Sequence, residues 1–193
     1  MTRVPYNQIA AIRADYHEAL RIFRPGRVEV LRAFTPPGLL CCIRVRVHAP
    51  TYSVGRSKKK KPRPRPGRSL DFEIRVRKGY PVLAPTVWFY GDRILASPNV
   101  NCMGVFLRNR PGADNRIPAI VTEVLRAILF VDRYEAPEGD DSERAAALAA
   151  WQRDMQRRGR FPTGEMENYL SRPMPNAPSI PVLRPRRRRG IRR

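Results

Sequence analysis

Apolar positions recur along the chain with two different periods, and each period predicts a different kind of element. In residues 7–23 they recur every three or four positions, as on one face of a helix. Pro25 and Gly26 follow and are expected to end that helix. Four later stretches are short and apolar, and most alternate with polar residues as half-buried strands do. These predicted strands are residues 28–34, 39–47, 70–76 and 86–90.

Helical spacing returns in the C-terminal half of the chain. Residues 117–130 are apolar almost all round, which predicts a buried helix. Residues 142–158 are rich in alanine and predict a second helix, whose start is favoured by Asp140 and Asp141. The order is a helix, about four antiparallel strands, an irregular stretch and two helices. This order indicates an α+β fold.

Two segments break the pattern because they are basic and rich in proline. Residues 55–68 contain no large apolar side chain and predict a mobile loop, inserted into a long hairpin of strands 39–47 and 70–76. From about residue 171 to the C-terminus the chain is expected to be disordered. We therefore expect one domain over residues 1–165, with a basic insertion at 55–69, followed by a basic tail at 166–193.

Composition adds a strong preference for anionic partners. The 193 residues carry a formal net charge of +21, which attracts nucleic acid, acidic proteins or other polyanions. No apolar run approaches the roughly 18 residues of a membrane span, so no membrane partner is expected. The N-terminus lacks the apolar core of a secretory signal, and a cytoplasmic location is expected.

The cysteines and histidines do not predict a metal or disulfide site. The chain has three cysteines, of which Cys41 and Cys42 are adjacent and none forms a CxxC motif. On a strand, Cys41 and Cys42 should point to opposite faces. The two histidines, His17 and His48, are far apart in sequence. No metal and no cofactor are expected.

The segment YPVLAPTVWFYGDRILASPNVNCMGVFL, residues 80–107, resembles ubiquitin-conjugating enzymes. The family has Tyr-Pro followed at fixed spacing by Pro, Val and Phe in its fourth strand. It then has His-Pro-Asn and a glycine. The matching residues here are Tyr80, Pro81, Pro85, Val87, Phe89, Pro98, Asn99 and Gly104. Ile94 matches the aliphatic residue before that motif, and Ala146, Trp151 and Asp154 resemble a later helix of the family.

The resemblance covers roughly residues 6–160 and implies the UBC-like fold. It also implies a site with two departures from the family. Ser97 stands where the family has histidine. When the leucines of the two motifs are aligned, Phe106 stands at the position of the catalytic cysteine. The resemblance therefore implies a non-catalytic variant that binds a ubiquitin-like protein or a partner enzyme of a conjugation pathway, rather than an active enzyme.

An active, divergent enzyme is the alternative. Cys102 would then form the thioester, with Asn99 three residues away to assist it. Cys102 precedes the glycine instead of following it, and cysteine is a common buried residue, so a packed thiol is the favoured interpretation. Asn99 likewise has a structural interpretation as a turn residue.

The basic segments support a third hypothesis, a nucleic-acid-associated protein on the same scaffold. Such segments bind phosphates in a salt-sensitive, sequence-independent way. Neither contains an aromatic residue for base stacking, so they equally fit solvated tails or contacts with an acidic protein. The candidate binding residues are Lys58, Lys59, Lys60, Lys61, Arg63 and Arg65 in the insertion, and Arg186, Arg187, Arg188 and Arg189 in the tail.

Overall fold

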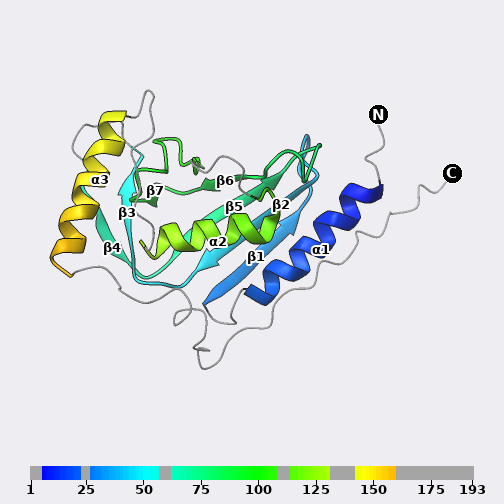
Figure 1. Ribbon diagram of the computed structural model, residues 1–193, viewed down its shortest axis with the longest axis horizontal. Helices are drawn as coiled ribbons and strands as arrows, with labels where there is room; N and C mark the ends of the chain where they lie inside the picture. The colour runs from blue at the N-terminus through cyan, green and yellow to red at the C-terminus, as the bar shows by residue number, and fades with distance from the viewer. Residues whose placement is uncertain (1–5, 23–26, 57–61, 108–113, 131–141, 160–193) are drawn as a thin grey trace.

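The computed structural model describes residues 6–22, 27–56, 62–107, 114–130 and 142–159 (Figure 1). Its elements are α1 Tyr6–Ile22, β1 Val28–Phe34, β2 Cys41–Val47, β3 Thr51–Gly55, β4 Arg65–Gly67, β5 Leu70–Val76, β6 Thr86–Phe89, β7 Arg93–Leu95, α2 Ile117–Ile128 and α3 Ser142–Arg157. The fold is α+β, as predicted. None of the described helices is long and apolar enough to cross a membrane.

The main sheet has four strands in the order β1-β2-β5-β6, and all neighbours are antiparallel. These are the four predicted strands. The long hairpin is confirmed, because β2 pairs with β5 from Cys41↔Val76 to Val47↔Leu70. A register shift between Val30 and Arg32 marks a bulge in β1.

One face of this sheet holds the hydrophobic core. Alternate strand residues such as Val45, Phe72 and Phe89 are 0% exposed, and they share the core with Ile120 and Leu125 of α2. In Figure 1, α2 lies across the sheet, and α1 packs beside α2. The other face carries the polar residues of the same strands, as alternation predicts.

The second sheet corrects the prediction for residues 55–68. Instead of a loop without packing, this part of the chain includes β4, which pairs with β3 from Thr51↔Gly67 to Ser53↔Arg65. On its other side β3 pairs with β7, which also lies in a stretch predicted to be irregular. β4 accommodates Pro66 because it is an edge strand, where one missing N–H need not break the ladder. Residues 57–61 lie outside the described part of the chain.

Both predicted C-terminal helices form, with small differences at their ends. α2 ends at Ile128 rather than residue 130, and Leu129 and Phe130 form a turn after it. α3 packs near the small sheet, where the ring of Trp151 lies 5.2 Å from that of Tyr52. The acidic turn at 140–141 and the predicted disordered tail lie outside the described residues.

Candidate functional site

The turn formed by Ser97, Pro98 and Asn99 is buried and closed by its own hydrogen bonds. The Ser97 carbonyl accepts from the Val100 amide at 3.1 Å, and Ser97 Oγ accepts from the Asn99 amide at 3.2 Å. Ser97 is 0% exposed and Asn99 is 4% exposed. The Ser97 side chain therefore stabilises the turn, and neither side chain is presented to solvent.

A second tight turn at residues 101–104 follows directly. The Gly104 amide donates to the Asn101 carbonyl at 2.9 Å, and Asn101 Oδ1 accepts from the Val105 amide at 2.9 Å. Cys102 is only 7% exposed at this turn, whereas Met103 is 58% exposed. The tip of the turn thus presents the thioether of Met103, and the thiol of Cys102 is packed against the protein.

Gly104 is required by the backbone at this point. Its φ is +85°, in the left-handed region, and its carbonyl accepts the Phe89 amide at 2.7 Å. A Cβ at this position would lie 2.4 Å from the Phe89 carbonyl oxygen. The close approach to β6 therefore depends on the absence of a side chain.

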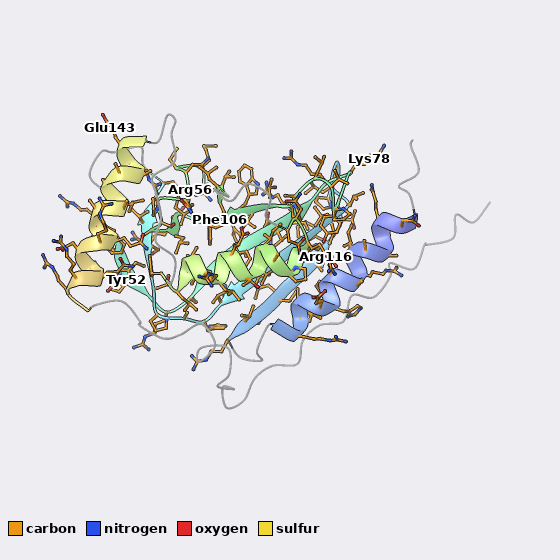
Figure 2. All side chains as sticks on the ribbon, viewed as in Figure 1. Tyr52, Arg56, Lys78, Phe106, Arg116 and Glu143 are labelled. Carbon is orange, nitrogen blue, oxygen red and sulfur yellow. The ribbon has the colours of Figure 1, made fainter. Side chains whose placement is uncertain are left out.

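The chain after Gly104 pairs with the outer edge of β6. The Phe106 amide donates to the Val87 carbonyl at 2.9 Å, and Trp88 forms a bridge with Val105. Phe106 is 8% exposed and belongs to the hydrophobic core. Leu107 is half-buried, and its amide donates to the Asn99 carbonyl at 2.7 Å. In Figure 2, Phe106 lies on the same side of the molecule as Arg56.

Arg56 fixes this segment by binding three backbone carbonyls. It donates to Gly91 at 2.7 Å, to Met103 at 2.8 Å and to Phe89 at 2.6 Å. Arg56 follows β3 directly, so it connects the small sheet to the turn at 101–104. Sequence reasoning missed this residue, because one arginine beside a lysine-rich run carries no signal for a long-range contact.

Arg144 of α3 makes a similar contact from the other direction. It is 3% exposed, and its Nη1 donates to the Val100 carbonyl at 2.6 Å. Sequence reasoning missed this contact too, since the alanine-rich helix pattern does not indicate which charged residue turns inward. The segment at 97–107 is therefore held by β6, Arg56 and Arg144 together.

The predicted basic residues are only partly described. Arg63 and Arg65 are exposed, and Arg65 is the first residue of β4. Lys58, Lys59, Lys60, Lys61 and Arg186 to Arg189 lie outside the described residues. Of the ten candidate binding residues, the structure therefore places only Arg63 and Arg65.

The three cysteines of the chain are all buried. Cys41 belongs to the core and Cys42 points to the opposite face of the sheet, next to Glu73. Burial raises the pKa of Cys41 and of Cys42 to about 11 in each case, so both thiols are protonated at neutral pH. Within the described ranges, no group of three or more His, Cys, Asp or Glu residues could hold a metal ion.

A buried polar network connects α1 to the start of α2. The hydroxyl of Tyr80, which is 1% exposed, donates to Asp15 and accepts from the Ile117 amide at 2.9 Å. Arg116 also donates to Asp15, with Nε at 2.9 Å. Burial, followed by the hydrogen bond to Asp15, raises the pKa of Tyr80. Tyr80 is thus part of the scaffold and caps the N-terminus of α2.

A second polar cluster lies on the opposite face of the main sheet. Glu73, with a side chain only 5% exposed, accepts from Arg44 Nε at 2.6 Å and from Arg75 Nη2 at 2.8 Å. Burial raises the pKa of the Glu73 carboxyl, but the hydrogen bonds from Arg44 and Arg75 lower it more. The pKa therefore lies below its ordinary value of 4.5.

This lowered pKa predicts a loss of stability in acid. A carboxyl with a depressed folded-state pKa stabilises the fold above its unfolded-state pKa, and the contribution is lost as the pH falls through the folded-state pKa. Glu73→Gln is expected to be less stable than the wild type at pH 7, and the difference should shrink below about pH 4. Urea unfolding between pH 3 and pH 7 measures it.

Glu143→Gln is the control, because Glu143 is an exposed residue of α3 and its replacement leaves the Glu73 cluster intact. A constant difference between wild type and Glu73→Gln across this pH range would contradict the ionised Glu73.

No family model matches the chain, and no curated protein matches it significantly. The fold and the contacts described above therefore carry the proposal of function.

Proposed function

We propose that this protein is a non-catalytic relative of ubiquitin-conjugating enzymes, which binds a ubiquitin-like protein or a partner enzyme of a conjugation pathway. The element order supports this proposal: a helix, a four-stranded antiparallel meander, a long segment with two tight turns, and two helices. Tyr80 and Gly104, two residues of the motif that the sequence suggested, stand at structurally demanding positions of that order.

The single observation that carries the proposal is the lack of an accessible thiol in the segment at 97–107. A conjugating enzyme needs a thiolate that can reach the C-terminal carbonyl of its partner. Aligning the leucines puts Phe106 at the nucleophile position, and Phe106 is buried in the core. Leu107, the next residue, lies beside Asn99 and also lacks a nucleophile. Cys102 lies on the earlier turn and is buried.

An exposed apolar loop supports the binding part of the proposal. Val82 and Leu83 are 83% and 59% exposed, which is high for large aliphatic side chains. The loop is held in place, because Leu83 donates its amide to the Gly79 carbonyl at 2.9 Å and the Val82 carbonyl accepts from Asn115 at 3.0 Å. Two neighbouring exposed apolar side chains on a fixed loop offer a small apolar surface that a protein partner can cover.

The test uses the ubiquitin-like proteins and activating enzymes encoded by the same genome. With ATP and these proteins, we expect no adduct that a reductant removes. We expect a complex with one of them, whose affinity falls at least about tenfold in Val82→Asp. The control is Arg13→Ala, on the exposed side of α1. Val105→Asp would not serve, because Val105 is half-buried next to β6.

Two results would overturn the proposal. A reducible adduct that is lost in Cys102→Ser would establish an active enzyme. The absence of any complex with these proteins would remove the binding function.

A further inference from the structure

The face of the main sheet that points away from α1 and α2 combines arginines with aromatic rings. We call it the outer face. Its arginines, from three neighbouring strands, are Arg32, Arg44, Arg46 and Arg75. The side chains of Arg44, Arg46 and Arg75 are 39%, 40% and 33% exposed, so this face is accessible to solvent in the described part of the chain.

Guanidinium groups lie over the rings of this face. Arg75 lies 4.5 Å from the centroid of Trp88, and Arg44 lies 5.1 Å from that of Tyr90. Phe34 has Arg32 at 4.8 Å and Arg44 at 5.5 Å. Planar cations and rings thus alternate across neighbouring strands.

The carboxylates of the face orient some of these arginines without occupying all their donors. Asp71 binds Arg46 through two hydrogen bonds, at 2.7 and 2.8 Å, and Glu73 binds Arg44 through Nε. Neither Nη atom of Arg44 makes a hydrogen bond to a described residue. The side chain of Arg32 makes no hydrogen bond or ion pair within the described ranges, where its contact is the ring of Phe34.

We propose that the outer face binds single-stranded nucleic acid. Bases of an unpaired strand stack on aromatic rings and on guanidinium planes, and the remaining arginine donors suit phosphate oxygens. The net charge of +21 attracts a polyanion to the molecule. An acidic protein would use the cations but brings planar side chains only here and there, whereas a single strand presents a planar base in every nucleotide, so the alternation favours nucleobases. This site goes beyond the proposed function and does not depend on it.

The first experiment distinguishes the contribution of the outer face to binding from that of the basic segments. All variants are made in the full chain, which keeps those segments unchanged. Fluorescence polarisation measures binding of a labelled oligothymidylate of about 15 nucleotides. Arg32→Gln combined with Arg44→Gln should weaken binding about tenfold, because stacking and phosphate contacts are both lost. Arg13→Gln with Arg153→Gln removes the same charge from exposed helix positions and should weaken it about twofold at most.

A charge-conserving pair tests stacking by itself. Arg32→Lys with Arg44→Lys keeps the net charge and an ion-pair partner for Glu73, but removes two guanidinium planes. Binding of the oligothymidylate should still weaken, by about fivefold. Arg13→Lys with Arg153→Lys should leave it unchanged.

Tryptophan fluorescence reports on the site directly. The chain has two tryptophans, and Trp151 packs with Tyr52 and Phe130, away from the outer face. Oligothymidylate should quench the fluorescence of the wild type and of Trp151→Phe. It should not quench Trp88→Phe, in which the stacking tryptophan is gone.

Three results would overturn the proposal. The first is that the Arg32 and Arg44 variants of the outer face bind oligothymidylate as their matched controls do. The second is that double-stranded DNA binds as tightly as the single strand. The third is that quenching persists in Trp88→Phe. If the Arg32 and Arg44 variants lost binding of a ubiquitin-like protein but kept oligothymidylate binding, the outer face would be a protein-docking surface instead.

Discussion

Replacing Asp15 with alanine is expected to lower the free energy of unfolding by about 3 kcal/mol. Asp15 is 2% exposed and accepts hydrogen bonds from the Tyr80 hydroxyl and from Arg116. Without this carboxylate, the buried Tyr80 hydroxyl loses its acceptor. The buried one of the two ion pairs between α1 and Arg116 is lost at the same time. Urea unfolding followed by circular dichroism measures the change.

Glu18→Ala is the matched control. Glu18 also lies on α1 and pairs with Arg116 at 2.8 Å, but its side chain is 50% exposed. Exposed ion pairs contribute little, so this variant should lose less than about 1 kcal/mol. If both variants lost the same stability, the burial of Asp15 would not be the cause. Tyr80→Phe should share most of the Asp15→Ala loss and add little to it in the double variant.

Replacing Gly104 with alanine is expected to cost about 3 kcal/mol of stability. Two effects add. A side chain is disfavoured at a φ of +85°, and the new Cβ would meet the Phe89 carbonyl oxygen at 2.4 Å. The obstacle is backbone, so no rotamer change relieves it. Thermal unfolding and the amide exchange of Phe89 should both show the loss.

Gly91→Ala isolates the first effect, the disfavoured φ. Gly91 has a similar φ of +92°, but nothing lies within 4 Å of a Cβ built there. This variant should therefore lose only the conformational part, about 1 kcal/mol. Equal losses at the two glycines would mean that the chain at 97–107 moves away from β6 at little cost.

The main sheet and the helices could be predicted from the sequence because their patterns are local. Alternation gave β1 and β5 with the observed ends, and three- and four-residue spacing gave α1 and α2 to within two residues. The pairing of β2 with β5 followed from their neighbouring positions in a hairpin.

The small sheet could not be predicted, because its strands are stabilised by pairing rather than by their own residues. β4 has the sequence Arg-Pro-Gly, which favours a turn, and it becomes a strand only through its contact with β3. Arg56 and Arg144 were missed for the same reason. Each reaches a carbonyl far away in sequence, and no local pattern encodes such a contact.

The candidate site could likewise be predicted only in part. The position of Gly104 followed from its motif, but the burial of Cys102 depends on a turn whose geometry only the structure gives. The outer face was visible in part as arginines alternating along residues 43–47 and charged residues alternating along residues 70–76. Its rings come from β1, β6 and Tyr90, and only strand order brings them next to these arginines.

The pairing of residues 104–106 with β6 also protects the protein from self-association. An uncovered edge strand offers unpaired amides and carbonyls to a second chain. Here the Phe89 amide of β6 donates to the Gly104 carbonyl, and the Val87 carbonyl of β6 accepts from the Phe106 amide. At the opposite edge of the sheet, the bulge and Arg32 in β1 discourage pairing. By covering β6, this segment therefore also keeps the sheet from growing by the addition of a second chain.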